Sequence, residues 1–409
     1  GTSGNSGTSG TSGTSEISGP SMTGSTMSGN TASNGGGVWV AKNATVHMSD
    51  LCLYQNSAHS LGAGIGALHR FSVSRTAIMF NVALGGGGGI ASKDIDLDLS
   101  SAVTIESNIA GLRLARRNSD DEEVFETSSF TFNAMATDPY GSKTFLDKAC
   151  HQEESCEHGG VGGGVLMLLS PTALESMVLH GGDIVANTAD GGGGGVAVIA
   201  SDASKQSFHL LGHQASATAS ATATTATTRV RKNVGKIGAG VLLLGLTATT
   251  RIGTPSSSPF PLEISDNKAV YHGWRQDNDP IAPFLLGKGG GMALVRCMKV
   301  LFQHTRIWKN FALSNGGGVS AEHSNLHTVP TTTLLIEQNV GHQGGGVNLV
   351  NASLTWHGTG KPRVRHNVAL LGGGVAMQHS HLAPDPVYLN NATAERPFNV
   401  LPMEPIVHF

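Results

Sequence analysis

Charged residues, cysteines and long apolar runs are scarce in this 409-residue chain. Charged residues make up 13% of it, about half the share in an average protein. Because the net charge is only −3, the composition gives no sign of a basic field for nucleic acid or anionic lipid. The chain lacks an apolar run of about 18 residues, so no transmembrane helix is expected. Its four cysteines are too few for a disulfide-framework protein.

Glycine is abundant, and most of it belongs to an internal repeat. Each repeat reads apolar-x-x-Asn-x-Ala and then reaches a glycine run closed by an apolar residue. The aligned asparagines are Asn30, Asn56, Asn81, Asn108, Asn133, Asn187, Asn233, Asn267, Asn310, Asn339 and Asn367. The apolar residues three positions before them are Met27, Leu53, Ile78, Ile105, Phe130, Ile184, Val230, Ile264, Ile307, Ile336 and Val364. The residues that close the glycine runs are Val38, Ile65, Ile90, Leu112, Val165, Val196, Val241, Met292, Val319, Val347 and Val375.

The repeat predicts an all-β fold, a right-handed parallel β-helix of about eleven coils with loop insertions. Uninterrupted repeats of 25 to 29 residues suit one coil of three short strands and three turns. Coils stacked about 4.8 Å apart place equivalent residues in columns, with the apolar columns inside. We expect the asparagines at a turn, since Asn tolerates the left-handed conformation and its amide can bond the next Asn in a ladder. The glycines allow a tight corner.

This repeat resembles the Phe-x-x-Asn and Gly-Gly-Ala-Ile repeats of the chlamydial-type polymorphic outer membrane proteins. The match extends from Met27 to Met377, although Phe occupies the first motif position only at Phe130. The resemblance implies a right-handed β-helix, a fold that occurs in many secreted proteins. It says little about function.

Three regions follow from the repeat boundaries. Residues 1–26 form a Gly/Thr/Ser-rich N-terminal segment, and 27–383 form the β-helix. Residues 384–409 form a proline-rich C-terminal cap or docking tail. Insertions are expected near residues 115–127, 136–158, 200–228 and 271–287. Insertions of this kind leave a solenoid at its turns and often build its binding surface.

The best candidate for chemistry is the alternating carboxylate group Asp94, Asp96 and Asp98. Alternation puts all three on one strand face, where they could bind Ca²⁺ or act as an acid/base pair. We favour a solvated strand face, because no neighbouring coil supplies a matching column of Asp, Arg or Lys. No Walker motif, dinucleotide fingerprint or Ser/His/Asp elbow is present, so no catalytic, cofactor-binding or metal residue is assigned and no cofactor is expected.

Cys150 and Cys156 are candidates for a disulfide within their loop, with free thiols or a zinc site involving the adjacent histidines as alternatives. Three Asn-x-Ser/Thr sequons, at Asn43, Asn351 and Asn391, are candidates for glycosylation.

The residue after each closing apolar residue is expected to point outward, and most such residues are small and uncharged. A flat, uncharged column suits close lateral packing against an insertion or another chain. We therefore expect an extracellular or cell-surface structural or adhesive protein, without enzymatic activity, that self-assembles as a subunit of a filament or coat. The alternatives are a carbohydrate-active β-helix enzyme of the lyase or hydrolase type and a glycan-binding module. Self-association is the expected partnership and glycans are further partners, whereas nucleic acid is not expected.

Overall fold

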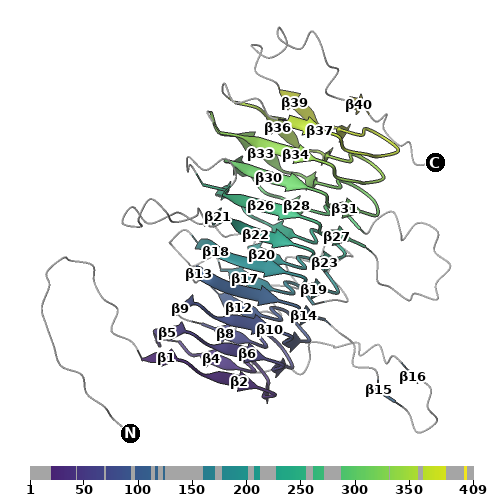
Figure 1. The fold of residues 1–409 in the computed structure, drawn as a ribbon. Coiled ribbons are helices and arrows are strands. Elements are labelled where there is room, and N and C mark those ends of the chain that lie inside the picture. The colour runs from purple at the N-terminus through teal and green to yellow at the C-terminus, as the bar shows by residue number, and fades with distance from the viewer. Residues whose placement is uncertain are drawn as a thin grey trace, which may run out of the picture.

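The structure is a computed structural model in which short parallel strands stack coil upon coil from the N-terminus to the C-terminus (Figure 1). It describes residues 20–42, 44–68, 71–93, 97–111, 116–117, 123–124, 160–170, 177–200, 207–211, 227–254, 261–270, 287–330, 332–357, 363–383 and 400–402. No helix occurs among these residues. The prediction of an all-β parallel β-helix is confirmed.

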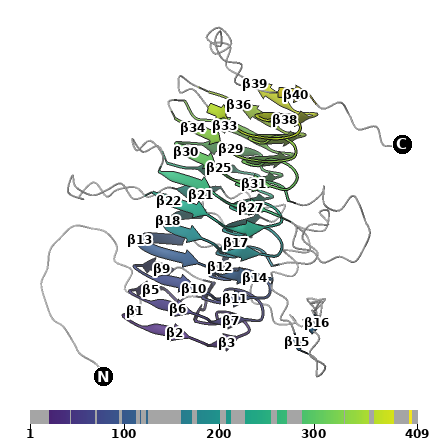
Figure 2. The same ribbon diagram turned by 45° about the vertical axis from the view of Figure 1, so that its right-hand side comes forward.

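Each coil contributes strands to three sheets, whose pairings between coils are all parallel (Figure 2). Sheet A has 19 strands and contains two columns, because most coils give it two strands. Its first column consists of β1 (Ser21–Thr23), β5 (Val46–Ser49), β9 (Phe71–Ser74), β13 (Leu97–Glu106), β18 (Met177–Val185), β21 (Phe208–Leu211), β25 (Thr249–Ile252), β29 (Lys299–Phe302), β33 (Asn325–Thr328), β36 (Ser353–Thr355) and β39 (His381–Ala383). Its second column consists of β2 (Thr26–Ser28), β6 (Cys52–Tyr54), β10 (Ala77–Met79), the C-terminal parts of β13 and β18, β22 (Thr228–Arg231), β26 (Leu262–Ser265), β30 (Thr305–Trp308), β34 (Leu334–Glu337) and β37 (Arg363–Arg365).

The other two sheets follow the aligned asparagines and the glycine runs. Sheet B consists of β3 (Thr31–Ala32), β7 (Ser57–Ala58), β11 (Val82–Ala83), β14 (Ile109–Ala110), β19 (Thr188–Ala189), β23 (Val234–Gly235), β27 (Lys268–Ala269) and β31 (Phe311–Ala312). Sheet C consists of β4 (Val38–Val40), β8 (Ile65–Ala67), β12 (Ile90–Lys93), β17 (Val165–Leu169), β20 (Val196–Ala200), β24 (Val241–Leu244), β28 (Met292–Val295), β32 (Val319–Glu322), β35 (Val347–Val350), β38 (Val375–Gln378) and β40 (Val400–Pro402).

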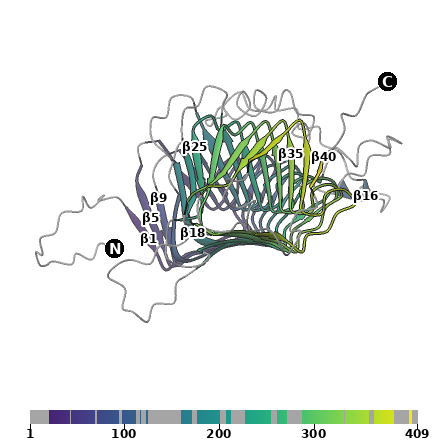
Figure 3. The same cartoon turned by 90° about the horizontal axis from the view of Figure 1, so that it is seen from above.

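The interior is filled by the predicted apolar columns, and the view from above shows the sheets enclosing it (Figure 3). Leu53, Ile78 and Ile105 stack in register in sheet A and are fully buried. Every described residue of the two predicted apolar sets is buried except Met27. Period-two alternation therefore directs one side chain in two into a single continuous core.

Ten of the predicted asparagines form a ladder from Asn30 to Asn367, and the eight between these two are buried. The Nδ2 of each donates to the Oδ1 of the next at 2.9–3.1 Å. The same Oδ1 also accepts the backbone N–H of the preceding asparagine. From Asn56 onward, Nδ2 also donates to the carbonyl of the apolar residue of the preceding coil. The ladder thus joins successive coils by side-chain bonds in addition to the strand pairings.

The asparagines do not themselves adopt the left-handed conformation that their residue type suggested. The residue before each one does, as at Gln55, Phe80 and Lys309, whose φ angles are 52°, 55° and 54°. A left-handed residue turns the chain sharply. The following Asn side chain then points into the coil, where its neighbours in the ladder satisfy it.

Two predicted coil positions are wrong. Asn108 bonds Asn187 directly, and Ile90 pairs directly with Val165, so no coil lies between these rungs. Asn133 and Leu112 lie outside the described residues. The fourth and fifth predicted repeats are therefore one coil interrupted by an insertion, of which the structure describes only the antiparallel pair β15 (Arg116–Arg117) and β16 (Glu123–Val124).

The solenoid extends beyond its predicted limits. It begins at β1, inside the segment 1–26, and β21 lies inside the predicted insertion 200–228. At the other end β40 pairs with β38, with Val400 opposite Val375, so part of 384–409 adds an eleventh strand to sheet C. The sequence from Val387 to Ala392 repeats the apolar-x-x-Asn-x-Ala spacing, which the alignment of the repeats did not include.

Candidate functional site

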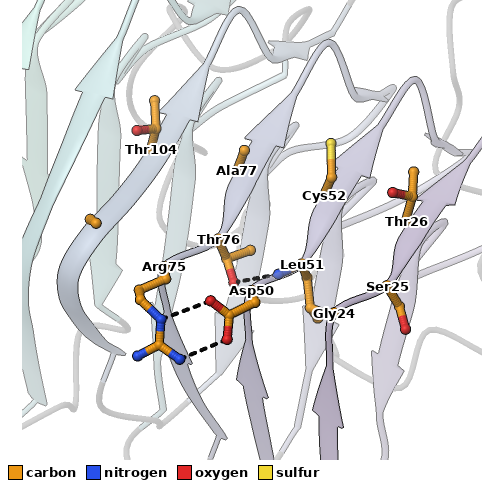
Figure 4. A pocket seen from close by; sticks show the side chains of 11 residues that line it. Gly24, Ser25, Thr26, Asp50, Leu51, Cys52, Arg75, Thr76, Ala77 and Thr104 are labelled. Atoms are coloured by element: carbon orange, nitrogen blue, oxygen red, sulfur yellow. Dashed lines mark hydrogen bonds and ion pairs between the residues drawn. The ribbon is translucent and has the colours of Figure 1, made fainter.

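A shallow groove of about 410 Å³ lies on the first coils, where the two columns of sheet A meet (Figure 4). The chain turns there at Gly24, Asp50, Arg75 and Ala102, whose φ angles lie between 44° and 66°. Because the turning residues occupy the same position in successive coils, their side chains stack along the groove. The local repeat thus places Asp50 beside Arg75, although they are 25 residues apart.

The groove contains a bidentate ion pair. Arg75 donates from Nε to Asp50 Oδ1 at 2.7 Å and from Nη2 to Asp50 Oδ2 at 2.6 Å. The hydrogen bond from Arg75 lowers the pKa of Asp50, so this group remains a carboxylate at neutral pH. Among the residues that line the groove, Asp50 is the one carboxylate, whereas glycoside hydrolysis ordinarily uses two. Polar contact with a ligand fits this geometry better than acid/base chemistry.

The carboxylate group proposed from the sequence falls largely outside the described structure. Asp94 and Asp96 are not among the described residues, and of Asp98 only the backbone in β13 is described. The calcium or acid/base interpretation therefore stays a prediction. In the part of the chain that is described, no three His, Cys, Asp or Glu residues are grouped as metal ligands.

The cysteines and sequons are only partly placed. Cys150, Cys156, Asn43 and Asn391 lie outside the described residues, and mass spectrometry under non-reducing conditions tests the disulfide. Asn351 directly follows β35 and is exposed, with a φ of 47°. The Asn351 side chain is therefore accessible for glycosylation.

The outward column of sheet C is not the free lateral surface that the sequence suggested. Trp39, at the first coil, is 36% exposed, but the later members that the structure describes are buried, and eight of them are at most 5% exposed. These eight members are Ala91, Leu166, Ala197, Leu242, Ala293, Ser320, Asn348 and Ala376. The glycine-rich segments of the same chain run over this column, and a Cβ at Gly86 would lie 2.8 Å from Leu166 Cδ2. The described members of the column are uncharged because their own chain covers them.

A network of charges lies on the outer face of the second column of sheet A. The Glu337 carboxylate, whose side chain is 4% exposed, accepts hydrogen bonds from Arg306 Nη2 at 2.6 Å and from Arg365 Nε at 2.9 Å. Burial acts to raise the pKa of Glu337, but the two arginines outweigh it and the pKa is lowered. Arg306 also lies over the Trp308 ring, with Cζ 4.1 Å from the centroid, and Lys309 Nζ lies 4.5 Å from it. The face is therefore preorganised around fixed charges.

Sequence reasoning missed this network because its members are 31 and 28 residues apart. The signal was present in the repeat. Arg306 stands four residues before its ladder asparagine and Glu337 stands two residues before the next, so both positions face outward. Aligning the outward positions of every repeat would have brought the charges together.

Both ends of the solenoid leave core residues partly uncovered. Met22 and Met27 in the first coil are half-buried, whereas Met48, in the next coil, is 1% exposed. Met377 and Leu382 are likewise only partly buried at the C-terminal end. Among the described residues, β1 to β4 each have a paired neighbour on one side only. Within the described part of the chain, the ends therefore present open strand edges over an incompletely covered core.

Within the described ranges, no helix is long and apolar enough to cross a membrane. No family model, curated protein or solved structure matches this chain, so its function has to be argued from its own geometry.

Proposed function

We propose that this chain is a structural β-helix protein whose copies stack head to tail, as subunits of a filament or coat outside the cell. The observation that carries the proposal is the N-terminal coil, whose strand edges are unpaired among the described residues and whose core residues Met22 and Met27 are half-exposed. Stacking another coil on this end would pair those edges and bury those side chains. Both changes favour association, since unpaired edges template further pairing and apolar burial is favourable.

The direction of stacking follows from the polarity of the ladder. Each asparagine donates toward the Oδ1 of the asparagine in the next coil. At the first rung, Asn30 Oδ1 accepts no hydrogen bond from the described residues, so the N-terminal end presents an acceptor. A C-terminal end presents donors, whereas a second N-terminal end would present another acceptor. Head-to-tail contact also keeps all strands parallel, as they are within the chain.

The C-terminal coils supply a matching apolar surface. Met377 and Leu382 pack against the core and are only partly buried in the last described coils. End-to-end stacking, and not lateral packing on sheet C, is therefore the contact that we propose. The resemblance of the repeat to the polymorphic outer membrane proteins and the exposed sequon at Asn351 support a location at the cell surface.

Association is tested by placing charges on the N-terminal end. Light scattering and electron microscopy of the full chain are expected to show species well above 42.1 kDa that grow with concentration. The double substitution Met22→Lys and Met27→Lys should return the chain to a monomer, because it puts two cations where an apolar face must close. Met298→Lys is the matched control, since Met298 is 57% exposed on the side of the solenoid and should not affect stacking.

Two results would contradict the proposal. One is a wild-type chain that stays a monodisperse monomer at high concentration. The other is loss of assembly in the Met298→Lys control to the same degree as in the double variant, which would indicate general aggregation and not end-to-end contact.

A further inference from the structure

The outer face of sheet A between β18 and β37 is basic, although the whole chain has a net charge of −3. Among the described residues, nine cationic side chains stand on this face or at the turn that follows it, against four acidic ones. The cations are Arg229, Arg231, Lys232, Arg251, Lys299, Arg306, Lys309, Arg363 and Arg365, and the acids are Asp183, Glu263, Asp266 and Glu337. The excess of five positive charges concentrates on one side of the solenoid.

The strand register orders these cations along the solenoid axis. Arg229 stands opposite Glu263, which stands opposite Arg306, and two coils further Arg363 occupies the same column. An arginine therefore recurs at every second coil, which gives a spacing of about 9.6 Å at the usual distance between strands. A regular row of this kind suits a linear polymer that carries charges at regular intervals.

The acidic residues neutralise only part of this row. Glu337 pairs with Arg306 and Arg365, Glu263 Oε1 lies 3.8 Å from Arg306 Nη1, and Asp183 lies 4.0 Å from Arg229 Nη1. Among the described residues, Arg231, Lys232, Arg251, Lys299 and Arg363 make no ion pair. These five cations are therefore the charges of the face that an anionic ligand can pair with.

We propose that this face binds an anionic polysaccharide, a uronate polymer laid along the solenoid axis with its carboxylates against the arginine row. Guanidinium groups bind carboxylates in bidentate geometry, and a rigid sheet holds them at a fixed repeat. The observations favour a glycan over single-stranded nucleic acid, because base binding uses open aromatic platforms. On this face the ring of Trp308 lies under Arg306 and Lys309. The proposal is independent of head-to-tail assembly and stands if that assembly fails.

The test uses the full chain and polygalacturonate oligomers in isothermal titration calorimetry at low and at 0.15 M salt, an ionic strength that screens exposed charges over about 8 Å. Binding is expected, and it should weaken as salt rises. The double substitution Arg229→Gln and Arg363→Gln should lower the affinity about tenfold, since it removes two of the three arginines of the row. The matched control is Lys42→Gln with Lys268→Gln, two exposed lysines off this face, and its affinity should stay within about twofold of wild type.

Neutral dextran should not bind, and unchanged thermal transitions should show that both double variants are folded. The proposal is overturned if polygalacturonate does not bind at low salt or if the two double variants lose affinity equally. It is also overturned if single-stranded DNA binds as tightly as the uronate polymer and loses affinity in the same variant, because the face would then be a nucleic-acid site.

Discussion

Removing one internal rung of the asparagine ladder is the most direct test of how the coils are held together. In Asn233→Ala, Asn187 loses the acceptor of its backbone N–H (2.9 Å) and of one Nδ2 hydrogen (3.1 Å). The carbonyl of Ile184 loses the donor Nδ2 of Asn233, at 3.1 Å. Asn267 Oδ1 keeps its bond from the backbone N–H of residue 233, so the damage lies mainly on one side of the substitution.

The magnitude follows from burial. Asn187 and Asn233 are both 0% exposed, so water cannot replace the lost partners. An orphaned buried donor costs about 1–3 kcal/mol, and two orphaned donors with one weakened acceptor give a loss of about 3–5 kcal/mol in the free energy of unfolding. Asn30→Ala should cost about 1 kcal/mol, because this terminal side chain donates one ladder bond and accepts none from the described residues.

Urea unfolding followed by circular dichroism measures the global effect, and hydrogen exchange of the Asn187 amide measures the local one. The local measurement is needed because the stability of a solenoid is a sum of contacts between neighbouring coils, so a few coils can unfold while the rest stay folded. Lys268→Ala, at an exposed position in β27 with an ordinary strand backbone, is the control and should change stability by less than about 0.5 kcal/mol. If Asn233→Ala costs no more than this control and the Asn187 amide stays protected, the ladder does not stabilise the coils.

Three further outcomes are expected. Ile336→Asp should destabilise the chain by about 3 kcal/mol or more in urea titrations, because a charge would replace a side chain that is 2% exposed; a loss below about 1 kcal/mol would contradict the burial of this column. Glu337→Gln should cost about 1–3 kcal/mol at neutral pH. The pKa of the wild-type carboxyl is lowered from its usual value of 4.5, so its stabilisation is complete above that pH and is lost as the pH falls through the lowered pKa. Unfolding curves of the two proteins should therefore converge in acid, and a constant difference would refute the role of the charge. Finally, burial raises the pKa of the Cys297 thiol to about 12. Under native conditions iodoacetamide should therefore label the half-buried Cys52 and leave Cys297 unmodified until the chain unfolds. Equal labelling of both thiols would refute the burial of Cys297.

The regular part of the fold was predictable because it depends on local repetition. Each repeat has an apolar residue three positions before its asparagine, and most repeats have similar lengths, so the coils can stack in register in one way. Residues such as Ile105 and Val347 are buried as expected. The prediction failed where the spacing was misleading. Asn133 matched the motif within an insertion, whereas Val400 lacked the preceding glycine yet pairs with Val375. The motif shows which segments have residue types that suit a coil. Which of these segments join the stack is decided by hydrogen bonding between coils.

The sequence by itself determined the β-helix, most of its apolar columns and the asparagine row, because each depends on a period within one coil. Only the tertiary structure decided what the outer faces are. Leu166 and Leu242 are buried beneath glycine-rich segments of their own chain, which removed the lateral surface that their column suggested. Composition gave a small negative net charge, yet stacking gathers Arg229, Arg306 and Arg363 into one column. Contacts between residues 28 or more positions apart depend on which coils become neighbours. Because the insertions differ in length, the sequence separation of two residues does not show whether their coils are neighbours.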